Sequence, residues 1–170
     1  MGVEFTGSVI IYTWLKASGN FSLSRNRILE FTEYLDDYDN GGQQTNTYAS
    51  TDISFSPNMV GAANLSFMPS KNIEFSLLSK YVGKQFLDNT QNENRKLDPF
   101  YVQDARFIYT IQKGWLKEAN IILQANNVFN KMYEPNGYTF SYLYGGELIT
   151  ENYYFPMAGR NFMIGVNLRF

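Results

Sequence analysis

Asn161-Phe162-Met163-Ile164-Gly165-Val166-Asn167-Leu168-Arg169-Phe170 is the stretch of sequence that decides the fold. Every second residue from Phe162 to Phe170 is apolar, and the residues between them are mostly polar or small. Successive side chains of a β-strand point to opposite faces. The stretch therefore predicts a strand with one apolar face and one mostly polar face.

The same period of two recurs along the rest of the chain. Six further segments show it, at residues 3–12, 15–31, 59–68, 73–86, 101–112 and 117–129. No stretch has the 3.6-residue period of an amphipathic helix. The sequence predicts an all-β fold, an antiparallel meander of about seven strands.

The connections between these segments alternate in length. Short ones are expected at residues 13–14, at 69–72 and around 113–115. Long, polar connections rich in turn residues are expected at about 32–58, 87–100 and 130–155. Short turns at one end of the strands and long loops at the other are typical of outer-membrane barrels.

The composition fits such a barrel better than a compact soluble core. Aromatic residues make up 17% of the chain, although its mean hydropathy is only −0.31. The longest unbroken apolar run is Val9 to Tyr12, far below the roughly 20 residues of a membrane-spanning helix. Dense aromatics with low hydropathy suit alternating strands with aromatic girdles. Residues 1–4 show no basic or apolar region of a signal peptide.

Several classes of chemistry are excluded by residues that the sequence lacks. It contains no cysteine and no histidine, which excludes disulfides, thiolate chemistry and zinc sites. The lack of histidine removes the commonest general base, and the carboxylates form no pair with a nucleophile. We therefore expect no enzyme activity and no cofactor. The formal charge of −2 argues against a nucleic-acid partner.

One acidic motif resembles the start of a calcium loop. Asp37-x-Asp39-x-Gly41 has two of the acidic positions, but its fifth position is Gly41. The position that should be a bidentate glutamate is Tyr48. The motif is better interpreted as a turn with solvated acids.

A strand count of seven has a consequence in a membrane. Only closed barrels keep every strand paired in hydrocarbon. Bacterial single-chain barrels have even strand numbers from eight upward. We therefore expect the chain to be a segment of a larger barrel.

Two motifs near the C-terminus resemble TonB-dependent outer-membrane receptors. They are Asn126-Asn127-Val128-Phe129-Asn130-Lys131-Met132-Tyr133 and Pro156-Met157-Ala158-Gly159-Arg160, followed by the terminal Phe170. Residues 78–90 and 97–100 match as well, and the resemblance covers residues 58–170. It is strongest to the branch that takes up iron chelates (siderophores) and related metal complexes.

The resemblance implies that residues 1–170 are the C-terminal part of a barrel of about 22 strands with a plugged lumen. It implies TonB-energised uptake of a small-molecule metal chelate across the outer membrane of a Gram-negative bacterium. The implied partners are outer-membrane lipid, the barrel-assembly machinery, the rest of the barrel, the plug, and TonB through that plug. In this topology the three short turns are periplasmic and the three long loops extracellular.

Two groups of site residues are predicted. Loop aromatics that could capture ligand are Tyr138, Phe140, Tyr142 and Tyr144, with Tyr153 and Tyr154 nearby; their alternative role is an aromatic girdle at the lipid headgroups. Gly165, Leu168 and Phe170 resemble the C-terminal signal that the assembly machinery recognises, by pairing with an exposed edge strand. An ordinary amphipathic strand is the alternative there.

A second functional hypothesis is a soluble, lipocalin-like antiparallel β protein that binds a small ligand. It predicts that the apolar set of the C-terminal strand points inward to a core. The receptor hypothesis predicts that Ile164 and Leu168 face hydrocarbon instead, with Asn167 on the opposite face.

Overall fold

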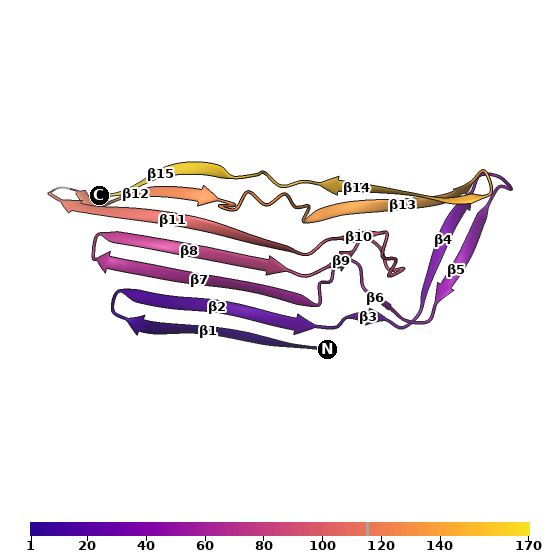
Figure 1. Cartoon of the computed structure of the whole chain (residues 1–170), viewed down its shortest axis with the longest axis horizontal. Helices are drawn as coiled ribbons and strands as arrows, with labels where there is room; N and C mark the ends of the chain where they lie inside the picture. The colour runs from indigo at the N-terminus through magenta and orange to yellow at the C-terminus, as the bar shows by residue number, and fades with distance from the viewer. Residues whose placement is uncertain (115) are drawn as a thin grey trace.

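The computed structural model describes residues 1–114 and 116–170, and its main element is a curved antiparallel sheet of seven strands (Figure 1). In spatial order the strands are β1 (Gly2–Tyr12), β2 (Leu15–Ser24), β7 (Met59–Ser70), β8 (Ile73–Val82), β11 (Phe100–Lys113), β12 (Leu116–Asn126) and β15 (Asn161–Arg169). Each predicted segment supplies one of these strands, so the all-β meander is confirmed. Three predicted segments were too long, because their strands end at Ser24, Val82 and Asn126.

The strand register keeps the two faces of this sheet chemically distinct. Thr6 pairs with Asn20 on one face, while Phe5 pairs with Phe21 on the other. At the far edge, Asn120 pairs with Asn167 and Ile121 with Val166. Because paired residues point to the same side, the alternation of each strand adds up to one apolar and one polar face.

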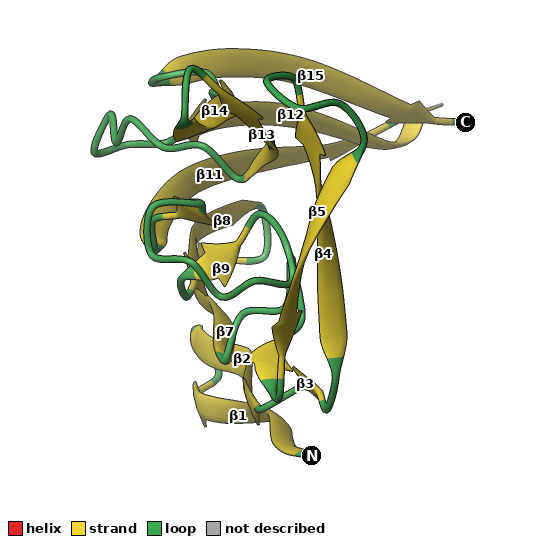
Figure 2. Ribbon diagram, turned by 90° about the vertical axis from the view of Figure 1, so that its right-hand side faces the viewer, coloured by secondary structure: helices red, strands yellow, loops and turns green. Residues whose placement is uncertain are grey.

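The apolar face of β15 is open to the surroundings. Ile164 is 79% exposed and Leu168 is 52% exposed. Figure 2 shows the strands as an arc from β1 to β15 that does not close on itself. The inward-facing core that the lipocalin-like alternative predicts for this strand is therefore absent from the described residues, and that prediction is wrong.

The connections are sorted by length, as predicted. The turns between β1 and β2, β7 and β8, and β11 and β12 lie at one end of the sheet, and the long connections lie at the other (Figure 1). Trp115, in the third predicted short turn, is outside the described residues. We call the two ends of the sheet the short-turn end and the long-loop end.

The long connections contain more strands than the sequence suggested. They hold β3 (Arg27–Ile28), β4 (Phe31–Asp37), β5 (Gln43–Tyr48), β6 (Thr51–Asp52), β9 (Gln85–Phe86), β10 (Lys96–Leu97), β13 (Asn136–Tyr144) and β14 (Glu147–Phe155). The interpretation of residues 32–58 and 130–155 as loops was wrong. Both segments are largely β-hairpins, because their backbones pair even where no apolar alternation marks a strand.

The two longest hairpins join into a second sheet. Its strand order is β14-β13-β4-β5, and β13 and β4 run parallel, with Tyr142 opposite Asp36. We call it the surface sheet. In Figure 2, seen from the long-loop end, its β4–β5 hairpin rises from beside β3, and Figure 1 shows that its tip meets the β13–β14 hairpin. Hairpins far apart in the sequence thus become one surface.

Most of the buried apolar side chains lie at the long-loop end of the molecule. Leu35, Phe86, Leu87 and Leu97 belong to the long connections, Val82 and Phe100 are the ends of β8 and β11 that meet them, and Ala119 lies within β12. Leu97 is only 2% exposed. The long connections therefore have a packed core of their own, which holds their conformation.

No helix in the described part of the chain is long and apolar enough to cross a membrane.

Candidate functional site

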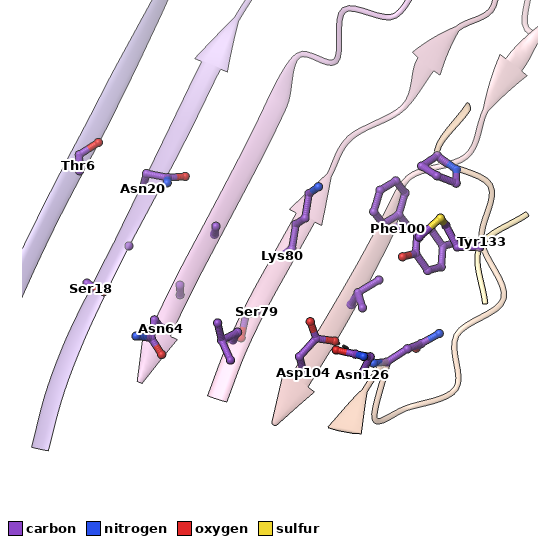
Figure 3. A pocket seen from close by; sticks show the side chains of 18 of the residues that line it. Thr6, Ser18, Asn20, Asn64, Ser79, Lys80, Phe100, Asp104, Asn126 and Tyr133 are labelled. Atoms are coloured by element: carbon purple, nitrogen blue, oxygen red, sulfur yellow. Dashed lines mark hydrogen bonds between the residues drawn. The ribbon is translucent and has the colours of Figure 1, made fainter. Parts of the chain in front are cut away.

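The concave face of the main sheet encloses a polar hollow of about 1140 Å³. Its lining comes from all seven main strands and from the loops around Tyr133 and Ala158. Thr6, Asn20 and Asn64 line one side, and Lys80 and Asp104 line the other (Figure 3). These residues belong to the face that the alternation predicts to be polar. A wall that carries amides, hydroxyls and charged side chains suits a water-filled or protein-filled interior.

The two motifs that carried the sequence resemblance pack against each other at the rim of this hollow. Asn127 is buried, and its side-chain amide donates to the carbonyls of Lys131 (2.9 Å) and Ala158 (3.3 Å). Asn130 accepts a hydrogen bond of 2.8 Å from the backbone N–H of Arg160. The asparagines thus join the connection after β12 to the one before β15.

Backbone geometry explains why asparagine stands at both positions. Asn127 and Asn130 have φ values of 51° and 53°, in the left-handed region that asparagine tolerates better than most residues. Gly159 is required for a different reason, since an added Cβ would lie 2.7 Å from Oδ1 of Asn130. The two motifs therefore hold these connections together by hydrogen bonds rather than forming a chemical site.

A buried charge cluster holds three long connections together. Arg95 is 2% exposed, and its Nη1 donates to Glu33 (2.6 Å) and Asp88 (2.9 Å). Its Nη2 lies 3.5 Å from Oγ1 of Thr150, and Tyr48 donates to the second oxygen of Glu33 at 2.9 Å. The cluster links both hairpins of the surface sheet to the loop between β9 and β10.

Sequence reasoning missed Arg95 altogether. It did not single out Glu33 either, whereas the structure places this carboxylate against Arg95 with little exposure. Sixty-two residues separate these two partners along the chain. No spacing rule connects them, so only the tertiary fold could find the cluster.

The predicted ligand aromatics lie on one face of the surface sheet. Tyr138, Phe140, Tyr142 and Tyr144 alternate along β13 and so point to the same side. Tyr153 stacks on Tyr138, with ring centroids 4.8 Å apart. Tyr154, by contrast, is opposite Gly137 and belongs to the other face.

The β4–β5 hairpin adds two tyrosines to this face that the sequence did not indicate. Tyr34 precedes Asp36 by two residues, and Asp36 is paired with Tyr142, so the three share one side. The ring of Tyr38 meets the ring of Tyr142 edge-on at 5.5 Å. We call this surface the aromatic face; its rings are Tyr34, Tyr38, Tyr138, Phe140, Tyr142, Tyr144 and Tyr153.

Carboxylates accompany these rings. Glu151 is opposite Phe140 and accepts hydrogen bonds from the hydroxyls of Tyr142 (3.0 Å) and Tyr153. These bonds lower the pKa of Glu151 from its ordinary value and raise the pKa values of the two tyrosines. Asp36 accepts a bond of 2.8 Å from the amide of Gln43. Both carboxylates are held by uncharged donors.

The tips of the two hairpins are fastened by one side chain. The carboxylate of Asp39 accepts the backbone N–H groups of Gly145 (2.9 Å) and Gly146 (2.8 Å). Asp37 is buried, and the backbone and side chain of Asn40 and the amide of Gln44 hold its pKa below the ordinary value. The motif forms a turn, as predicted, and Asp39 is exposed, but the prediction of a solvated acid was wrong for Asp37. The group Asp37–Asp39 organises turns, and no metal cluster occurs among the described residues.

The predicted assembly residues lie at an edge of the main sheet. Gly165 and Leu168 belong to β15, which pairs with β12 on one side and with no other strand among the described residues. Leu168 and Phe170 are exposed, and Lys117 donates to a terminal carbonyl of Phe170 at 2.9 Å. The geometry provides an edge strand with an outward aromatic.

No protein-family model and no curated protein matches the chain. Solved structures, by contrast, match it over nearly its whole length. The siderophore receptor PiuA from Acinetobacter baumannii matches with a TM-score of 0.74 at 15% identity, over 98% of this chain. The fold is that of part of a TonB-dependent receptor barrel. The ferric-catecholate import receptor Fiu from E. coli K12 matches with a TM-score of 0.52 at 12% identity, over 99% of this chain.

These matches cover only 21% of PiuA and 27% of Fiu, so the chain spans about a quarter of either receptor. At such low identity they establish the fold alone, which is like that of part of an outer-membrane receptor barrel. The sequence resemblance to TonB-dependent receptors is confirmed at that level.

Proposed function

We propose that the chain is the C-terminal β-barrel segment of an outer-membrane receptor that imports an iron chelate with energy delivered through TonB. The main support is the seven-stranded sheet, which has one exposed apolar face, one polar hollow and connections sorted by length. Its likeness to PiuA over 98% of the chain supports the same proposal. In this proposal the exposed apolar face meets lipid, and the rest of the barrel pairs with both edge strands.

The polar hollow is proposed to face the plug of the complete receptor. Its amides and hydroxyls can exchange hydrogen bonds with water or with another polar surface. TonB would act on that plug, from the short-turn end. This places the surface sheet outside the cell, where ligand arrives.

Tyr138, Phe140, Tyr142 and Tyr144 are proposed as ligand contacts. Their rings offer large, stiff contact surfaces with polar tips. A girdle role suits them less, because the surface sheet lies beyond the ends of the main strands (Figure 1). Gly165, Leu168 and Phe170 are proposed as the assembly signal, since β15 offers an open edge.

Growth under iron limitation tests the transport proposal. Cells that depend on this protein are given single iron sources, each a defined ferric chelate, with TonB present or deleted. We expect growth on at least one chelate, and only with TonB. Growth on none, or uptake of a glycan in place of a chelate, would overturn the proposal.

A further inference from the structure

The charge of the surface sheet differs sharply from that of the rest of the chain. Residues 31–48 and 136–155 contain six carboxylates and neither lysine nor arginine, whereas the whole chain has a formal charge of only −2. The remainder is therefore net positive, and the surface sheet is the acidic part of the molecule. Among hydrogen bonds of the described residues, Arg95 is the one cationic side chain that reaches these hairpins.

That single cation acts on the face away from the rings. Arg95 pairs with Glu33, which is opposite Asn46 and two residues from Leu35, a buried side chain. Residues 34 and 36 point to the other side. The aromatic face therefore keeps its carboxylates without a cationic partner in its own two hairpins.

Three carboxylates lie among the rings. Asp36 is paired with Tyr142, Glu147 with Tyr144 and Glu151 with Phe140. The bonds of Glu151 come from tyrosine hydroxyls, so they orient the carboxylate without neutralising it. Aromatic rings attract cations to their faces, and nearby carboxylates add to this attraction.

From this charge complementarity we infer that the aromatic face binds a small ligand that carries a positive charge. The inference rests on the proposed receptor function and specifies its ligand class. An anionic complex would meet carboxylates with no lysine or arginine in either hairpin to offset them. The charge preference is thus a property of this chain's own residues, and it differs from what the name of Fiu, a ferric-catecholate import receptor, would suggest by analogy.

A series of iron chelates that differ only in charge tests the inference. Ferric desferrioxamine B carries one free ammonium, its N-acetyl derivative is uncharged, and its N-succinyl derivative carries a carboxylate. Binding of each, with radiolabelled iron, is measured on outer membranes from cells that make the protein. We expect the cation to bind about tenfold more tightly than the uncharged form, and the anion most weakly. Added salt should reduce the difference.

Substitutions test whether the carboxylates of the aromatic face cause the preference for the cationic chelate. D36N with E151Q keeps side-chain shape but removes two charges, and should reduce the cation's advantage over the uncharged form about fivefold. D98N is the matched control, because Asp98 is exposed and lies outside both hairpins. Its charge preference should equal that of the unmodified protein.

Three results would overturn the inference: equal binding of all three chelates, tightest binding of the anion, or binding of none. A loss of preference in D98N equal to that in the double variant would overturn it as well. Cation binding that persists without TonB-dependent growth would contradict the transport proposal alone. The two failures are therefore distinguishable.

Discussion

Arg95 shows how one side chain can fix the arrangement of several loops. Its guanidinium is almost fully buried, and two carboxylates from different connections meet it on the same nitrogen. Removing one partner of a buried ion pair costs more than the pair contributes, because the remaining charge stays buried. The cluster is thus the most sensitive point of the long-loop end.

Arg95→Met should therefore loosen the loop between β9 and β10. We expect a local loss of about 3 kcal/mol, since Glu33 and Asp88 would face each other without a cation. The readout is amide exchange of Leu87, whose N–H donates to the carbonyl of Arg95 at 2.8 Å. It should exchange on the order of a hundredfold faster.

Lys84→Met is the control for this prediction. Lys84 pairs with Glu93, but both side chains are exposed, and such pairs contribute about 0–1 kcal/mol. Similar exchange rates at Leu87 in the two variants would contradict a special role of Arg95.

Glu151 and its tyrosines make a prediction about pH. The pKa of Glu151 is lowered by the hydroxyls of Tyr153 and Tyr142, so its contribution is present above the ordinary value of 4.5 and is lost as the pH falls through the lowered pKa. The pKa values of the tyrosines are raised by the same bonds. Their contribution is present below 10.0 and is lost as the pH rises through the raised values.

Glu151→Gln should therefore make two tyrosines ionise at lower pH. The change is visible as earlier phenolate absorbance in an alkaline titration. Glu147→Gln is the matched control. Glu147 lies on the same hairpin, and among the described residues it accepts no hydrogen bond from either hydroxyl. A titration curve unchanged by Glu151→Gln would contradict the bonding pattern.

Among the elements, the hairpins illustrate what sequence patterns can and cannot predict. The seven strands of the main sheet were recognisable because each has one apolar face, which the alternation of its residues makes visible. Gln43-Gln44-Thr45-Asn46-Thr47 in β5 is polar on both faces, so nothing in its pattern marks a strand. It is a strand because its backbone pairs with β4.

The candidate site likewise contains residues that the sequence indicated and residues that only the structure reveals. Tyr138, Phe140, Tyr142 and Tyr144 were grouped from the sequence as loop aromatics that could capture ligand, but their place on one strand was not recognised. Tyr34 and Tyr38 could not be assigned to the same face, because the parallel pairing of β13 with β4 brings together residues about a hundred positions apart. Long-range pairing of this kind leaves no local signal.

Asp39→Ala should separate the tips of the two hairpins. The carboxylate accepts two backbone N–H groups, and its loss leaves Gly145 and Gly146 without that acceptor. Amide exchange at both glycines should rise by about tenfold, which corresponds to roughly 1–1.5 kcal/mol for the lost bonds. Asp36→Ala, in the strand β4 that leads to this turn, should leave the exchange of these two amides unchanged. Equal protection in Asp39→Ala would show that the tips are held by other contacts.

For the whole molecule, the proposed barrel requires the apolar face of the main sheet to meet lipid. Two adjacent residues of β15 test this requirement, because Val166 and Asn167 point to opposite faces. A charge on the lipid face of a barrel costs about 2–4 kcal/mol near the bilayer midplane, whereas the lumen tolerates it.

Val166→Arg should therefore reduce the amount of protein assembled in the outer membrane severalfold, while Asn167→Arg should leave it near the normal level. Assembly is measured as the fraction that resists unfolding by detergent until it is heated. The reverse order of the two variants would place lipid on the other face and contradict the barrel assignment.

The main sheet has an odd number of strands, and this settles how a closed barrel can be completed. Since every neighbouring pair is antiparallel, β1 and β15 point in the same direction, as the arrows in Figure 1 show. Joining these two strands directly would create a parallel seam. A cylinder that stays antiparallel all the way round needs an odd number of additional strands between them, whether one or fifteen. A second copy of this sheet would supply seven, but only if it were inverted, with its long connections at the short-turn end of the first.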